Sequence, residues 1–254
     1  MPDPNCERCG GSGWIVEERD GLSGVRECGC REPVDQQTLY QQASIPPLYA
    51  RTSFETFVTH QSSQEMQREL SRVFLAARSF AREFPNTPKP GLLLVGPPGT
   101  GKTHLAVSVL KILIERGFDC SFFDYQRLLD LIRRGWDPTA GSSSREAYST
   151  ALEVGVLLLD DIGSHRVTEW VEDTVTSIIT TRCNEQRPLI ATTNLTDVEL
   201  GDGVRVRDAG TPGQVVYRTS LAERIGARAR SRLFEMCKVV VMPNVSDYRI
   251  QTSR

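Results

Sequence analysis

The chain has 254 residues, of which 39% are hydrophobic and 24% charged, and this composition excludes a disordered or fibrous protein. Its apolar runs are much shorter than the roughly 20 residues of a membrane-spanning helix, and its first 20 residues lack the pattern of a secretory signal. We therefore expect a cytoplasmic protein with no membrane partner. The net charge is −2, but residues 205–254 carry ten basic and four acidic side chains, which indicates phosphate or nucleic-acid contact unless it reflects a coding bias toward arginine.

Four cysteines fall within the first 30 residues, as the pairs Cys6-x-x-Cys9 and Cys28-x-Cys30. Four thiolates fill a tetrahedral Zn²⁺ site and leave no open position for catalysis. The residues between the two pairs have the pattern of a β-hairpin, and so short a segment needs a staple to fold. We predict a zinc-binding head at residues 1–33. Free or redox-active thiols are the alternative, because C-x-C is a less typical spacing.

Residues 34–61 are rich in Pro, Gln, Ser and Thr and are predicted to form a linker, so that the main domain spans residues 62–254. The apolar spacing between Met66 and Phe84 predicts a helix. Strands and helices then alternate, which favours a parallel sheet covered by helices. We expect strands at 91–95, 119–123, 155–159, 188–192 and 238–242, and helices at 102–116, 125–134, 168–185 and 221–235. Residues 135–144 and a Gly-rich insert at about 200–220 are predicted to be loops.

The strongest motif in the chain is a phosphate-binding loop between the first predicted strand and its helix. Residues 96–103 fit G-x-x-x-x-G-K-[ST] in the strand-to-helix context that the motif requires. Backbone N–H groups beside the glycines would approach phosphates, Lys102 would bridge the β- and γ-phosphates, and the Thr103 hydroxyl would ligate Mg²⁺. The predicted nucleotide-binding residues are Gly96, Pro97, Pro98, Gly99, Thr100, Gly101, Lys102, Thr103 and His104.

Polar residues follow two later strands and complete a predicted ATP site. Asp160 and Asp161 end the apolar run 156–159, and a buried strand rarely ends in paired carboxylates without a function. We expect Asp160 to hold Mg²⁺ and Asp161 to orient or activate the attacking water. Asn194 follows the strand at 188–192 and would polarise the γ-phosphate or the water, although an Asn there is commonly only a turn residue.

These three elements, in this order, resemble AAA+ ATPases, a family of P-loop NTPases with an α/β fold and a five-stranded parallel sheet. The stretches 158–163 (LLDDIG) and 187–195 (RPLIATTNL) are similar to bacterial helicase loaders of the DnaC/DnaI type and to IstB-type transposition ATPases. The resemblance extends from about residue 45 to 254, and the Cys-rich start resembles the zinc-bearing heads of some helicase loaders.

The resemblance implies further roles that composition does not show. Arg232 matches the arginine finger that reaches a neighbouring subunit's γ-phosphate, and Arg249 matches the second sensor arginine, although surface salt bridges are the commoner fate of arginine. Such loaders bind single-stranded DNA in assemblies. The matching regions contain candidate DNA contacts at Arg133, Arg134, Trp136, Arg166 and Trp170, and either Trp would alternatively pack inward.

The resemblance therefore implies an ATP-dependent loader of a replicative hexameric DNA helicase, which self-associates through its ATPase domain. Asp161 stands where many AAA+ enzymes have Glu, so hydrolysis is expected to be slow. Two alternatives remain open at this point. One is an IstB-type transposition helper that assembles on duplex DNA, and the other is a nucleotide-binding adaptor with little turnover.

Overall fold

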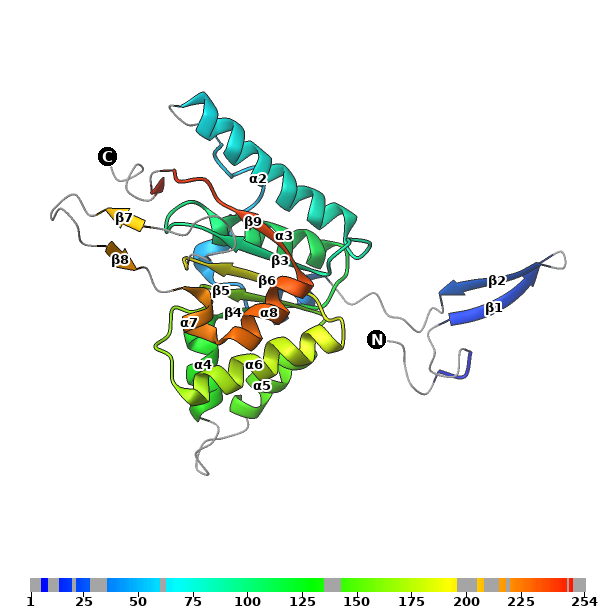
Figure 1. The fold of residues 1–254 in the computed structure, drawn as a ribbon. Helices are drawn as coiled ribbons and strands as arrows, with labels where there is room; N and C mark the ends of the chain where they lie inside the picture. Colours follow the sequence, from blue (N-terminus) through cyan, green and yellow to red (C-terminus); the bar gives the residue numbers. More distant parts are fainter. Residues whose placement is uncertain are drawn as a thin grey trace.

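The computed structural model describes residues 6–8, 14–19, 22–27, 36–59, 63–134, 143–195, 205–207, 215–217, 220–245 and 247–248. Near the start of the chain, strand β1 (Trp14–Arg19) pairs antiparallel with β2 (Leu22–Glu27) (Figure 1). This confirms the hairpin that was predicted between the two cysteine pairs. Cys9, Cys28 and Cys30 lie outside the described residues.

The main sheet has five parallel strands in the order β4-β5-β6-β3-β9, as the alternation of strands and helices predicted (Figure 1). Its strands are β3 (Gly91–Val95), β4 (Cys120–Asp124), β5 (Val156–Asp160), β6 (Leu189–Thr193) and β9 (Cys237–Val241). The three central strands β5, β6 and β3 are buried along their whole length, as is typical of a parallel sheet with helices on both faces.

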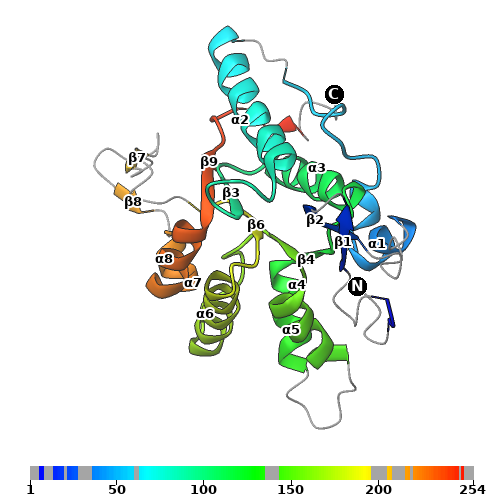
Figure 2. The ribbon, with the colours of Figure 1, turned by 90° about the vertical axis from the view of Figure 1, so that its right-hand side faces the viewer.

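Two hydrophobic clusters cover the two faces of this sheet. Leu92 and Leu94 of β3 belong to one cluster, while Leu93 and Val95 belong to the other, because successive side chains of a strand point to opposite faces. The first face is covered by α1 (Gln36–Gln42), α2 (Gln64–Glu83) and α3 (Lys102–Glu115) (Figure 2). The second face is covered by α4 (Tyr125–Arg134), α5 (Ser143–Glu153), α6 (Glu169–Asn184), α7 (Leu221–Ile225) and α8 (Ala227–Met236) (Figure 2).

The segment predicted as a linker is folded over its described part. Residues 36–59 contain α1 and the short 3-10 helix η1 (Pro47–Tyr49), and they place Leu39, Ala43 and Phe54 in the first hydrophobic cluster. Pro-, Gln- and Ser-rich composition suggested an extended connection, but these few apolar side chains are enough to attach the segment. Residues 36–59 therefore pack as part of the main domain.

Three further differences concern the second half of the chain. Helix α5 was not predicted and begins inside the expected loop at 135–144. The helix expected at 221–235 is two helices, because Gly226 adopts a positive φ of 84° and ends α7. Within the predicted insert, β7 (Arg205–Arg207) pairs antiparallel with β8 (Val215–Tyr217).

No helix among the described residues has the length and apolar character needed to cross a membrane.

Candidate functional site

The phosphate-binding loop joins β3 to α3, as predicted, and its glycines are required by the backbone and by two neighbours. Gly99 and Gly101 have φ values of 73° and 93°, which L side chains rarely adopt. A Cβ on Gly99 would collide with the carboxylate of Asp247, and one on Gly101 would collide with the ring of Phe57. The Tyr248 N–H also donates to the Gly99 carbonyl at 3.2 Å. The loop is thus enclosed by segments far away in the sequence.

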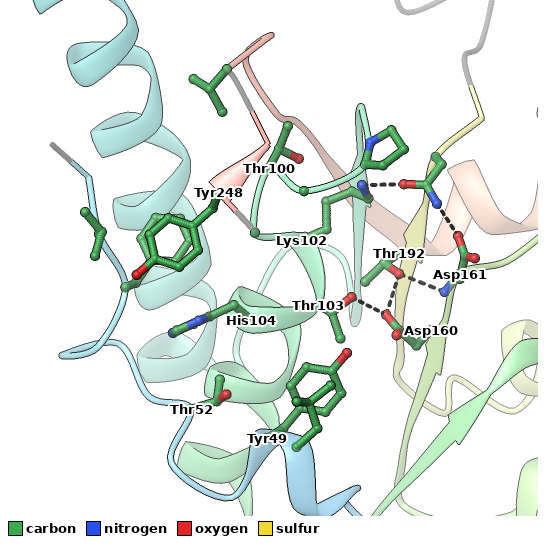
Figure 3. Close-up of a pocket in the computed structure, with 18 of the residues that line it drawn as sticks. Tyr49, Thr52, Thr100, Lys102, Thr103, His104, Asp160, Asp161, Thr192 and Tyr248 are labelled. Atoms are coloured by element: carbon green, nitrogen blue, oxygen red, sulfur yellow. Dashed lines mark hydrogen bonds between the residues drawn. The ribbon is translucent and has the colours of Figure 1, made fainter. Parts of the chain in front are cut away.

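Lys102 is buried and points toward the ends of the central strands (Figure 3). Its ammonium donates to the Pro97 carbonyl at 2.7 Å and to Asn194 Oδ1 at 2.6 Å. Asn194 Nδ2 in turn donates to Asp161 Oδ1 at 2.5 Å. The predicted phosphate-binding lysine, the polar residue after β6 and the second acid therefore form one hydrogen-bonded chain, with Asn194 in its centre.

Asp160 is held by two hydroxyls at the end of β5. Thr103 Oγ1 donates to Asp160 Oδ1 at 2.9 Å, and Thr192 Oγ1 donates to the same oxygen at 2.7 Å (Figure 3). Burial raises the pKa of Asp160, because it disfavours the charged form. A hydroxyl and a buried carboxylate are the hard oxygen ligands that Mg²⁺ prefers, so this donor set fits the predicted magnesium.

Thr192 is a functional candidate that the sequence analysis did not single out. Its buried hydroxyl donates to Asp160 and also accepts from the Asp161 backbone N–H at 2.8 Å. Asp161 has a positive φ of 59°, a conformation that costs free energy for a non-glycine residue unless its surroundings hold it there. The hydroxyl of Thr192 therefore positions both acids. The only sequence signal was its place in the Thr-Thr-Asn run after a strand.

A cavity of about 750 Å³ contains these polar groups and continues onto an apolar wall. The wall is made by Leu48, Phe57 and Val58, from the segment that was predicted to be a linker, and by Val245 and Tyr248, which lie far along the sequence from that segment. Leu48, Val58 and Tyr248 are 82%, 46% and 48% exposed, and they are three of the six large hydrophobic residues that are exposed in the described part of the chain. Their concentration here indicates a ligand with an apolar face beside its phosphates.

Of the other predicted site residues, His104 also lines the cavity, Arg232 lies away from it, and Arg249 lies outside the described residues. The ring of His104 points at the segment that was predicted to be a linker, where its Nε2 lies 2.8 Å from the Ser53 carbonyl oxygen. Arg232 is on α8 and pairs with Glu235 at 2.7 Å, on a surface that does not line the cavity. Arg249 lies outside the described residues, although its neighbours Asp247 and Tyr248 contact the loop.

The described candidate DNA contacts lie at the end of α4, after β5 and at the start of α6. Arg133 and Arg134 are exposed at the end of α4, and Arg166 is exposed after β5. Trp170 is half-buried and packs against the second hydrophobic cluster, which supports the alternative that it packs inward. Trp136 lies outside the described residues.

The predicted zinc site is not tested by the structure. No group of three or more His, Cys, Asp or Glu side chains in the described ranges is arranged to hold a metal ion. Of the four predicted ligands only Cys6 lies within those ranges, so this observation does not bear on the four-cysteine site.

Comparisons with known proteins identify the family and the fold of the chain. Residues 25–204 match the family model of the IstB-like ATP binding proteins. The replicative helicase loader DnaC of Escherichia coli K12 is 24% identical to the chain over 197 residues, which cover 77% of each protein. A crystal structure of the DnaC helicase loader matches with a TM-score of 0.60 and 30% identity, over 78% of this chain and all of the other. The crystal structure of DnaI has the same fold, with a TM-score of 0.58 and 19% identity over 79% of this chain and 95% of the other. Because the matched residues 25–204 include the phosphate loop, both acids and Asn194, the chain belongs to the IstB-like ATP-binding protein family.

Proposed function

We propose that the chain binds ATP and Mg²⁺ in this cavity and hydrolyses the nucleotide slowly. The observation that carries the proposal is the continuity of one cavity from the phosphate loop to the apolar wall. Lys102 and the loop N–H groups would bind the phosphates, and the wall would take the base. Thr103 and Asp160 would hold Mg²⁺, which neutralises charge that develops on the phosphates. Arg249 follows residues that touch Gly99, and this supports a role for it beside the nucleotide of its own subunit.

Asp161 and Asn194 would orient the attacking water. Their present hydrogen bond with each other, and that of Asn194 with Lys102, occupies the groups that ATP would require. A γ-phosphate that draws Lys102 away would release the amide oxygen of Asn194 for the water. The short side chain of Asp161 reaches less far than Glu, which supports slow turnover.

We further propose that the protein loads a replicative hexameric DNA helicase, with bound ATP as the switch for assembly. Support comes from the DnaC relatives named above. Arg232 is exposed and would serve self-association as a finger toward the next subunit's nucleotide. Single-stranded DNA would contact the exposed Arg133, Arg134 and Arg166, with Trp136 as a stacking candidate and Trp170 as a weaker one.

Residues 1–33 would form a zinc-binding head that docks on the helicase in the cytoplasm, with Cys6, Cys9, Cys28 and Cys30 as the ligands. The donor chemistry supports Zn²⁺, because four thiolates match its preferred set, and the β1–β2 hairpin lies between the two pairs. Metal analysis of reduced protein tests this site directly. About one zinc per chain is expected, and a Cys28→Ser variant should lose it; metal-free reduced protein would refute the site.

The loader function is tested by co-purification with a hexameric helicase in the presence of ATP. We expect capture of the helicase, loss of capture without ATP, and slow phosphate release that the Lys102→Ala variant abolishes. Capture of a transposase with duplex DNA instead would favour the IstB-type helper. Helicase capture with no phosphate release, with or without single-stranded DNA, would identify a nucleotide-binding adaptor.

A further inference from the structure

Helix α3 carries a row of polar side chains along one face that contacts the residues preceding α2. His104, Lys111 and Glu115 are spaced by seven and four residues, which places them on the same side of a helix. Most other side chains of α3 are buried and apolar. A polar row on such a helix requires partners, and all three find them in residues 36–58, here called the arm.

The contacts run along the whole helix. At its carboxyl end, Tyr40 donates its hydroxyl to Glu115 Oε1 at 3.0 Å. Near its middle, Lys111 Nζ donates to the backbone carbonyls of Tyr49, Ala50 and Thr52, each at 2.8 Å. At its amino end, His104 Nε2 lies 3.2 Å from Thr56 Oγ1, and its ring meets Phe57 edge to face. The arm is therefore attached to the same helix that begins the phosphate site.

Lys111 is the strongest of these attachments. Its ammonium has three donors and each has a carbonyl acceptor, which a compact NH₃⁺ group achieves and the planar fork of arginine does not match. Only four of the 30 basic residues of the chain are lysine, so the composition of the chain would favour arginine at this position. Burial of Lys111 lowers its pKa, and the three carbonyl oxygens hold the charge.

The carbonyls that Lys111 holds lie between the residues of the apolar wall. Leu48 precedes them, and Phe57 and Val58 follow them. The phosphate loop and the part of the wall that the arm supplies are thus positioned by two parts of one helix, the amino end of α3 and its middle. A detached arm would no longer hold Leu48, Phe57 and Val58 at this distance from the phosphate loop.

We propose that Lys111 is a positioning residue for nucleotide recognition. By attaching the arm to α3, it sets the distance between the apolar wall and the phosphate loop, and so gives a nucleoside triphosphate its advantage over a bare polyphosphate. This inference rests on the proposed ATP site and adds the residue that determines recognition of the base.

The test compares binding of ATP and of inorganic tripolyphosphate, both with Mg²⁺, by titration calorimetry of the full chain. Lys111→Met keeps the aliphatic stem and removes the three donors. We expect ATP binding about tenfold weaker, with tripolyphosphate binding changed less than about twofold. Lys89→Met is the matched control, since Lys89 also donates to a backbone carbonyl, that of Phe234 at 2.6 Å, but away from the cavity. It should leave both affinities unchanged.

Equal losses for both ligands, or no loss for either, would overturn the inference. A wild-type chain that binds neither ligand would refute the ATP site itself, which is a different result. If Lys111→Met does not fold, Leu48→Ser tests the same wall at an exposed position. It should weaken ATP binding severalfold and spare tripolyphosphate, and unchanged ATP binding would overturn the inference.

Discussion

The two ends of the five-stranded sheet both bury charged side chains, but they satisfy them in different ways. At the amino end, the fully buried Arg182 of α6 donates to the carbonyls of Ala151, Leu152, Gly155 and Pro188. These acceptors end α5 and precede β5 and β6, so the guanidinium joins four segments. At the carboxyl end, the buried Lys102 and Asp160 are bonded to side chains that border an open cavity.

The difference separates a structural charge from a functional one. The partners of Arg182 are backbone carbonyls fixed in several elements, so a ligand cannot readily take their place. Burial lowers the pKa of Arg182 to about 10. The polar chain from Lys102 through Asn194 to Asp161 is made of side-chain groups, and a ligand can replace one of these partners without a change in the backbone. Burial of charge therefore indicates function only where the partners are replaceable and a cavity reaches them.

The largest effect is expected from breaking the amino end. Arg182→Met should lower the free energy of unfolding by about 3 kcal/mol or more, because it removes the buried guanidinium that donates to four backbone carbonyls. Urea denaturation measures the change. Arg187→Met, which alters a partly exposed neighbour, should cost less than about 1 kcal/mol. A cost for Arg182→Met as small as that of its neighbour would contradict the structural role.

Breaking the carboxyl end should act on binding instead of folding. Lys102→Ala is expected to weaken ATP binding by about 100-fold, because the phosphates lose their nearest cation. Fluorescent-nucleotide titration measures this change, and Lys89→Ala serves as the control for loss of a lysine elsewhere. The thermal midpoint of Lys102→Ala should stay close to that of the wild type. Unchanged ATP affinity would refute the site.

The polar residues at the carboxyl end of the sheet could be predicted from the sequence, but the apolar wall of the cavity could not. The phosphate loop, Asp160, Asp161 and Asn194 are each placed by a local pattern, namely a strand followed by polar residues at the edge where parallel strands end. Strand positions were predicted to within about one residue for the same reason, since buried apolar runs of this length have few other structures open to them.

The apolar wall was not predictable, because tertiary contacts create it. Residues 36–59 have the composition of a linker, and it is tertiary contacts, such as the carbonyl acceptors around Lys111 and the packing of Phe54, that reveal that they fold onto α3. The break at Gly226 is similar. It depends on a positive φ and on the carboxylate of Glu172, which a Cβ there would meet, and neither is visible in the helical spacing around it.

A smaller effect should come from loosening the acids without removing them. Thr192→Val keeps the side-chain shape and removes the hydroxyl that holds Asp160 and the Asp161 N–H. We expect phosphate release about tenfold slower and a weaker dependence of ATP binding on Mg²⁺, with Mg²⁺-free ATP binding unchanged. Thr192→Ser, which restores the hydroxyl, should recover most of the rate. Equal rates for the Val and Ser variants would exclude the positioning role.

The smallest expected effect is a gain of stability when the buried carboxylate of Asp160 is replaced by a neutral amide. Asp160→Asn keeps an oxygen that can accept from Thr103 and Thr192 and removes a buried carboxylate whose pKa burial raises. Without nucleotide, the variant should be more stable than the wild type by about 1 kcal/mol at neutral pH, and Mg²⁺ with ATP should no longer stabilise it.

The pH dependence of this difference follows from the raised pKa of Asp160. The wild type should recover the difference as the pH falls through the raised pKa of Asp160 toward the ordinary value of about 3.9. Asp130→Asn, at an exposed position on α4, should show neither change. If the extra stability of Asp160→Asn did not shrink as the pH fell, the buried carboxylate would not be its cause. The charge of Asp160 would then not destabilise the fold, and in this respect Asp160 would resemble the structural charge of Arg182.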